Sequence, residues 1–404
     1  MQPTRQNKVT HLSIVIGLLL VFGLYFPTTA SQHLSIFSVS GYLICFVLLA
    51  TLALRKRGHS SFPVCIVLLS ITPLLLVFTF TSQLSTLRLG ALLGYGVLSL
   101  LLISNLRDIG LPQWFEHMWV AVNIVNIFAG FAIVVGIQPI NDFIIARYSV
   151  AYDELLPNML ALHKPVLTFG SHSTAAFFLY LFFWINLQRY KLGGQKLSLM
   201  FSVCYLFLTA CLLSVSALVF GAAEIFQLVT LVRSSLRHKF ALAVVSLCLI
   251  LVMAVSWSSS INWGASLEVV KTILRDPSNG LSGRLLPGGT MYFDLQYLQD
   301  HPFSPVGTSF KEGMMFGDCG PVEYVLRGSL PLLFLMYGGL FYFLRRSVIL
   351  RTYAYFLFTV IVVFELGMTT ITSLRALYLI PVFIVYLNSL TVSRAEHYSP
   401  PGSQ

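Results

Sequence analysis

The chain has 404 residues, of which 56% are hydrophobic and only 10% are charged, and its formal net charge is +10. This composition excludes an ordinary soluble globular domain and is typical of a polytopic membrane protein. In such a protein the positive charge reflects basic cytoplasmic loops that face anionic lipid, so a nucleic-acid partner is not expected.

Apolar runs fill most of the chain. The first, from Leu12 to Phe26, follows Arg5 and Lys8 and lacks a good cleavage site, which indicates an uncleaved first span. The others lie near 34–54, 62–80, 86–104, 114–136, 167–187, 197–213, 215–232, 240–258, 329–344, 352–372 and 374–391. Each is close to the length that a bilayer requires, so we predict an all-α polytopic membrane protein with about twelve transmembrane helices.

The stretch from 197 to 232 must hold two short spans, with a tight turn around Ser214 and Ser216. Cysteines add no further constraint. Five of the six lie inside apolar runs, where Cys behaves as a small hydrophobic residue, and Cys319 has no second Cys in its loop. We therefore expect neither a disulfide framework nor a bound metal or cofactor.

Short clusters of Lys and Arg indicate the orientation. With both termini in the cytoplasm, the clusters at 55–57, 107, 189–196, 233–239 and 345–351 all fall on the inner side, as the positive-inside bias requires. Residues 1–258 would then carry spans one to nine, with a small extracytoplasmic loop at 137–164. Residues 259–328 would form one large extracytoplasmic loop, 329–391 spans ten to twelve, and 392–404 a cytoplasmic tail.

The end of the large loop carries the candidate active site. The stretch G-D-C-G-P-V-E-Y-V-L-R begins at Gly317 and places Asp318 in a Gly-rich turn. Glu323 and Arg327 follow four residues apart, a spacing that puts both side chains on one face of a helix. A solvated surface pair would show the same pattern, but charges at the mouth of a membrane domain are costly unless they are paired or used.

Three short stretches resemble motifs of the Wzy-type polysaccharide polymerases, a bacterial inner-membrane family related to the O-antigen ligases. Residues 164–173, K-P-V-L-T-F-G-S-H-S, resemble the family's R-P-x-G-T-F-G-N-P-N segment, with Lys164 in place of Arg. Residues 213–218, L-S-V-S-A-L, resemble its S-x-S-R turn without the Arg. Arg284 followed by H-P-F-S-P-V-G-T at 301–308 resembles the Arg and the P-x-x-G-x-G segment of the family's large loop.

The resemblance implies a metal-independent glycosyltransferase at the outer face of the bacterial inner membrane. It would move a glycan from one undecaprenyl-diphosphate carrier to the non-reducing end of another lipid-linked repeat unit, making O-antigen, capsule or exopolysaccharide. Its partners would be the undecaprenyl-diphosphate-linked oligosaccharide and the lipid bilayer. A chain-length regulator and a flippase are candidate protein partners.

This reaction needs a general base for the acceptor hydroxyl and cations for the diphosphate leaving group. We predict Glu323 as the base, because a helix would hold it beside Arg327, and Asp318 as a sugar-binding or loop-ordering group. Arg284 is the predicted catalytic cation. The predicted substrate-binding residues are Lys164, His172, Arg327, Arg147, Arg375 and His301.

Alternatives remain for several residues. His172 could equally anchor the end of a span, and a role in a turn is favoured for His301. Glu224 and Glu365 lie inside predicted spans and are functional candidates by default, although either could simply pair with a Ser, a Thr or Arg375.

Two other functions also remain. An O-antigen ligase, which moves finished glycan to a lipid A core or to protein, is the closer one. In the ligases a His followed by Asn occupies the region of Asp318 and Glu323, and its absence here favours the polymerase. A flippase or transporter of lipid-linked sugars should show repeated halves, and the chain has no evident repeat.

Overall fold

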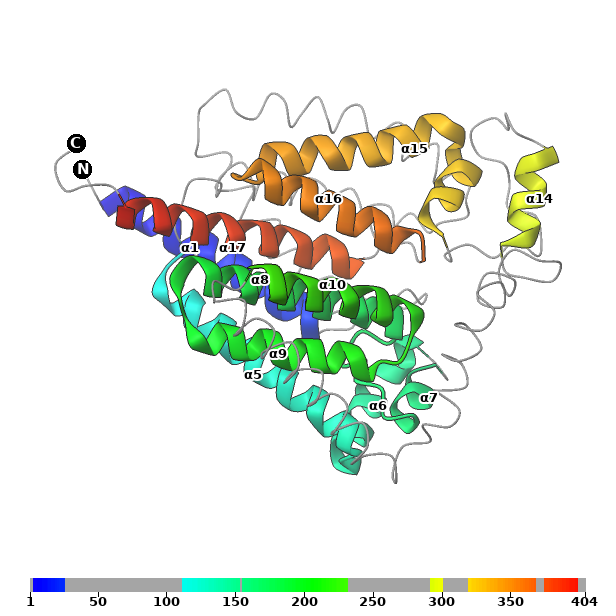
Figure 1. The fold of residues 1–404 in the computed structure, drawn as a ribbon, viewed down its shortest axis with the longest axis horizontal. Helices are drawn as coiled ribbons and strands as arrows, with labels where there is room; N and C mark the ends of the chain where they lie inside the picture. Colours follow the sequence, from blue (N-terminus) through cyan, green and yellow to red (C-terminus); the bar gives the residue numbers. More distant parts are fainter. Residues whose placement is uncertain are drawn as a thin grey trace. The chain divides into compact units, whose positions relative to one another are not determined.

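A computed structural model describes residues 3–25, 111–152, 155–231, 291–300, 319–367 and 374–398. Every regular element within these ranges is an α-helix and none is a strand, which confirms the predicted all-α class (Figure 1). The chain divides into two compact units. Unit 1 comprises Met1–Phe115 and Ser278–Gln404, and unit 2 comprises Glu116–Pro277.

Unit 2 is built around α8 (His172–Gly193). A helix that is apolar all round needs cover on every side, and α8 is buried without interruption from Ala175 to Arg189. The helices α9 (Lys196–Cys211) and α10 (Val215–Leu231) pack against α8 and against each other. These three helices are drawn in green in Figure 1.

The other helices described in unit 2 precede this group. They are α5 (Gln113–Val135), whose first residues belong to unit 1, α6 (Gln138–Tyr152) and α7 (Leu155–Ala161). Gly136 makes the turn from α5 to α6 with a φ of 78°. A Cβ at Gly136 would also collide with the imidazole of His163, so both the backbone and the packing require glycine there.

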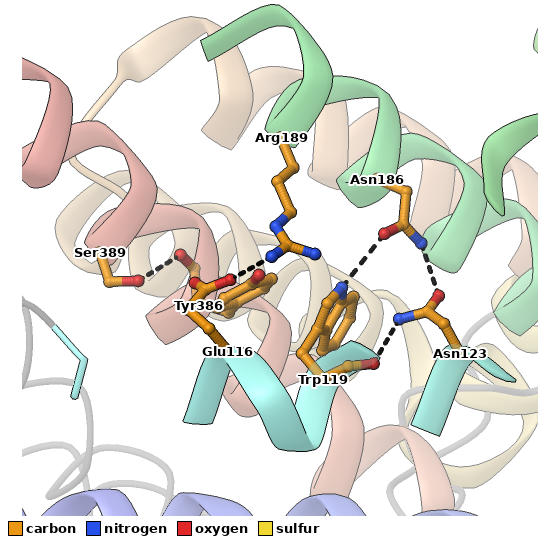
Figure 2. Close-up of polar contacts among 7 residues, drawn as sticks. All are labelled: Glu116, Trp119, Asn123, Asn186, Arg189, Tyr386 and Ser389. Atoms are coloured by element: carbon orange, nitrogen blue, oxygen red, sulfur yellow. Dashed lines mark hydrogen bonds and ion pairs between the residues drawn. The ribbon is translucent and has the colours of Figure 1, made fainter. Parts of the chain in front are cut away.

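Polar side chains join α5 to α8 (Figure 2). The Trp119 indole donates to Asn186 Oδ1 at 3.2 Å, and Asn186 Nδ2 donates to Asn123 Oδ1 at 2.6 Å. Nearer the end of α8, Arg189 forms an ion pair of 2.6 Å with Glu116. These contacts satisfy groups that would be costly if buried alone, and they fix the register of the two helices.

The described residues of unit 1 form two helix pairs. One pair is α15 (Gly320–Ser347) with α16 (Arg351–Glu365), and the other is α1 (Pro3–Tyr25) with α17 (Leu374–Tyr398). The short helix α14 (Tyr292–Asp300) contacts α15.

Asn388 links α17 to the turn between α15 and α16. Its Nδ2 donates to the Ser347 carbonyl at 2.7 Å, and the Ile349 amide donates to its Oδ1 at 2.9 Å. One buried amide side chain therefore satisfies both a free carbonyl and a free N–H at a helix end.

Each predicted run within the described ranges contains a helix, although the bounds differ, and α8 begins at His172 rather than at residue 167. The helices α6 and α7 lie in the predicted small loop at 137–164 and are not among the predicted runs. The division of 197–232 into two helices is confirmed by α9 and α10. α15 begins at Gly320 rather than at residue 329, because its first turns are helical without being apolar. The predicted runs at 34–54, 62–80, 86–104 and 240–258 lie outside the described residues.

Few of the described helices are both long enough and apolar enough to cross a membrane. Within the described ranges, Gln113–Val135 is the one helix long and apolar enough to cross a membrane by length and composition. Shorter apolar helices lie at Ser13–Tyr25, Lys196–Cys211, Ser216–Thr230 and Leu379–Val392. The number of about twelve spans therefore stays a prediction.

The ion pair between α5 and α8 gives a test of the packing in unit 2. Glu116→Ala should lower the free energy of unfolding by about 2–4 kcal/mol, because it leaves a buried guanidinium without its carboxylate. Only 6% of the Arg189 side chain is exposed. Denaturant unfolding of the purified protein in micelles would measure the change.

Lys191→Ala is the matched control. Lys191 lies in the last turn of the same helix and has no ion pair among the described residues. Its substitution should change the free energy of unfolding by less than about 0.5 kcal/mol. Equal losses in the two variants would contradict the assigned role of the ion pair.

Candidate functional site

The segment 164–173, which connects α7 to α8, has an unusual backbone. Leu167 has a φ of 52° and Gly170 a φ of 78°, and His163 just before the segment has a φ of 55°. Left-handed conformations at residues with a Cβ cost on the order of 1–3 kcal/mol each. The segment is therefore held in one shape by its surroundings, and its Val166 and Phe169 side chains are buried.

Ser171 lies within this segment and is the last residue before α8. Its Oγ accepts a hydrogen bond from the Thr174 amide at 3.2 Å and donates one to Thr174 Oγ1 at 2.8 Å. This is a standard N-cap, and it places His172 as the first residue of the helix, where its side chain is half-buried.

The second motif, 213–218, is the turn between α9 and α10. Leu213 has a φ of 46°, and Ser214 Oγ accepts from the Ala217 amide at 3.2 Å, so Ser214 caps α10. Ser216 Oγ then donates to Ser173 Oγ at 3.4 Å. The two motifs therefore meet in unit 2 through residues that lie 43 positions apart in the sequence.

Lys164 begins the first of these motifs. Its side chain is half-buried and has no ion pair in the described part of the chain. Burial disfavours the charged form, and it lowers the pKa of Lys164 from its ordinary value of 10.5. An unpaired and partly desolvated ammonium is suited to bind an anionic group.

The other predicted residues fall in different parts of the chain. Glu323 and Arg327 lie four residues apart within α15, so the predicted helical spacing is confirmed for the backbone. Arg147 is exposed on α6 of unit 2, and Arg375 is buried in α17 of unit 1, with 3% of its surface exposed. Arg284, His301 and Asp318 lie outside the described residues.

Glu224 lies in the interior of unit 2. It is fully buried on α10, and one of its oxygens accepts a hydrogen bond from the Thr209 hydroxyl at 3.1 Å. Its other oxygen has no partner among the described residues. One turn further along, Gln227 donates to the Tyr180 hydroxyl at 2.6 Å. The expectation that Glu224 pairs with a Ser or Thr is confirmed.

Glu365, also fully buried, makes contacts that the sequence analysis missed. Tyr324 and Tyr337, both on α15, donate to its two carboxylate oxygens at 3.3 and 3.1 Å. The sequence indicates only that a carboxyl group in an apolar run needs hydrogen-bond donors, and it does not show that these tyrosines, one before and one within the predicted span 329–344, supply them.

Within the described residues, no group of three His, Cys, Asp or Glu side chains is placed to hold a metal ion. No protein-family model, curated protein or solved structure matches the chain. Function must therefore be inferred from the residues of this chain.

The contact between the two motifs can be tested by cross-linking. Ser173→Cys combined with Ser216→Cys, in a chain whose six native cysteines are replaced by Ala, should form a disulfide on mild oxidation. The two Oγ atoms lie 3.4 Å apart, so a small rotation of each side chain brings the sulfur atoms to bonding distance. Loss of maleimide labelling, counted by intact mass, would measure the bond.

Ser173→Cys with Thr230→Cys is the control pair, because Thr230 lies about four turns further along α10. Cross-linking of this pair at the same rate, or failure of the first pair to cross-link, would contradict the meeting of the two motifs.

Burial of Lys164 predicts a pH dependence of stability. Because its pKa is lowered by folding, the unfolded chain binds more protons than the folded chain between that lowered value and 10.5. The contribution of Lys164 to stability therefore rises with pH across this range. Lys164→Met should be at least as stable as the wild type at neutral pH, with a difference that narrows as the pH approaches 10.5.

Unfolding of both proteins from about pH 7 to about pH 11 would test this, with the exposed Lys196→Met as control. The opposite result would be a wild type that is more stable than Lys164→Met at neutral pH, with a difference that shrinks at high pH. That result would show that Lys164 has a stabilising partner.

Proposed function

We propose that the chain is a polytopic inner-membrane enzyme that polymerises undecaprenyl-diphosphate-linked repeat units at the outer face of a bacterial membrane. The observation that carries this proposal is the hydrogen bond between Ser173 and Ser216. It brings together two of the segments on which the resemblance to the Wzy-type polymerases rests, although they are distant in sequence. A shared site is the simplest reason for both motifs.

Exposed apolar side chains support a lipid environment. On α5, Ile124 and Phe128 are 53% and 63% exposed, and on α10 Phe226 is 69% exposed. Large apolar side chains repeated along helix faces are unfavourable in water and favourable against acyl chains. Together with the composition of the chain, they favour a location in a lipid bilayer, and for the topology we keep the predicted twelve spans with both termini in the cytoplasm.

The contacts within unit 2 are compatible with that topology. Glu116 and Arg189 are both predicted at inner helix ends, and they form an ion pair. Ser173 and Ser216 are both predicted at outer helix ends, and they form a hydrogen bond. Each contact therefore joins residues that the predicted orientation assigns to the same side of the membrane.

In the proposed reaction, a hydroxyl oxygen of the acceptor sugar attacks the anomeric carbon of the donor glycan. The bond between that carbon and the diphosphate oxygen breaks, and undecaprenyl diphosphate leaves with the bonding electron pair. Glu323 takes the proton of the acceptor hydroxyl and releases it to water.

Cations are needed as negative charge develops on the leaving diphosphate. Lys164, Arg284 and Arg327 are proposed for this role, with Arg147 and Arg375 as further candidates. His172 begins α8 beside the Ser173 hydroxyl, and we assign these polar groups to the sugar, together with His301.

The glycan profile of a deletion strain tests the proposal. Loss of the chain should leave single repeat units on the final acceptor. Complementation with Asp318→Asn should restore part of the polymer, whereas Glu323→Gln should restore almost none, because loss of a general base costs on the order of 10² to 10⁴ in rate.

Immunoblots of membrane fractions would establish that both variants are present at wild-type level. Polymer stranded on the lipid carrier in the deletion strain would identify a ligase instead. Wild-type polymer with Glu323→Gln would remove Glu323 from the role of base and make Asp318 the candidate.

A further inference from the structure

The first turn of α15 lacks a side-chain cap of its own. Cys319 occupies the N-cap position in an extended conformation and makes no capping hydrogen bond, and Pro321 follows within the first turn. The amide groups and the positive end of the helix dipole at such a terminus normally attract an acceptor or an anion. The same turn leads directly into Glu323, the proposed base.

A carboxylate from the neighbouring helix lies at this position. Glu365, the last residue of α16, is fully buried and packs against Gly320, the first residue of α15. A Cβ at Gly320 would come within 2.9 Å of Glu365 Cδ and would collide with its Oε2. Only glycine therefore allows the carboxylate to approach the helix start this closely.

Two tyrosines of α15 hold the same carboxylate. Tyr324 lies one turn into the helix, is 2% exposed and donates to Glu365 Oε1 at 3.3 Å. Tyr337 lies more than three turns further along and donates to Oε2 at 3.1 Å. Three points along α15, at Gly320, Tyr324 and Tyr337, therefore contact one side chain of α16.

We infer that Glu365 is a positioning residue, which supplies an anion at the start of α15 and holds the first turns of this helix against α16. Because a helix turns by a fixed angle per residue, fixing Tyr324 also fixes the backbone of the adjacent Glu323 and of Arg327. Glu365 is buried, so it acts through α15 and does not touch the substrate. This role rests on the proposed function.

The test needs one readout at the helix start and one of catalysis. Cys319 is half-exposed beside the first turn, so its alkylation by a maleimide, in a chain whose other five cysteines are replaced by Ala, reports on that turn. Purified protein in liposomes with lipid-linked repeat units would give kcat and KM.

Glu365→Ala should accelerate the alkylation of Cys319 and lower kcat on the order of tenfold to a hundredfold with little change in KM, because the base is displaced while substrate contacts remain. Glu365→Gln, which keeps the shape and one acceptor oxygen, should recover part of both. Tyr337→Phe is the second variant, to be used if Glu365→Ala does not fold. It removes one hydrogen bond to Glu365 at a half-buried position, and it should change the alkylation rate and kcat in the same directions.

Glu224→Ala is the matched control, because Glu224 is the other fully buried carboxyl group among the described residues and lies in unit 2. It should leave the alkylation of Cys319 unchanged. Gly320→Ala alone should also accelerate the alkylation of Cys319. In the double variant Gly320→Ala with Glu365→Ala, the increase should be smaller than the two single effects combined, because the added methyl group then has room.

The outcomes separate this inference from the proposed function. In one outcome, Cys319 is alkylated faster in Glu365→Ala, but even the wild type does not polymerise the repeat units. This would support the contact at the helix start and would refute both the polymerase function and the role of Glu365 in catalysis. An active wild type whose kcat is unchanged by Glu365→Ala and by Tyr337→Phe would refute the positioning role, whatever the alkylation rate.

Discussion

The structure depends on one kind of interaction, in which a polar side chain within an apolar helix meets a partner on the neighbouring helix. The cost of leaving such a group unpaired is high because no water is present to replace the partner. In unit 2, Thr209 meets Glu224 and Tyr180 meets Gln227. These contacts select one rotation of α10 against α8 and α9, which hydrophobic packing alone would not specify.

The same requirement acts at the helix ends. Asn388 satisfies a carbonyl and an amide of the turn after α15, and Ser171 and Ser214 cap the starts of α8 and α10. These side chains near helix ends therefore form hydrogen bonds with backbone groups. The Ser173 and Ser216 hydroxyls differ, because their hydrogen bond joins two turns and caps neither helix.

The sequence predicted well what depends on local pattern. Apolar runs located the longer helices but not α6 and α7, and the position of Ser214 and Ser216 within an apolar stretch correctly divided α9 from α10. It placed the start of α15 too late, because the predicted spans were uninterrupted apolar runs and the first turns of α15 contain the charged residues Glu323 and Arg327.

Contacts between helices could not be predicted in the same way. The bonds of Glu365 to Tyr324 and Tyr337 depend on which helices are neighbours and how each is rotated, and neither property is written in a local pattern. The approach of Gly320 to Glu365 is a further case, since a single glycine at a helix start has many possible causes.

Several features of the candidate site are costly for folding. Leu167 and Leu213 adopt left-handed conformations that residues with a Cβ avoid, and the Lys164 ammonium is partly desolvated without an ion pair in the described part of the chain. A segment that served only to connect helices would be more stable with glycine at the first two positions and an apolar residue at the third. All three costs fall in the two motifs that the hydrogen bond between Ser173 and Ser216 joins. Under the proposed function, a bound anion would offset the desolvation of Lys164 and would need the fixed backbone around it, so both the strain and the charge are consistent with a site for the diphosphate.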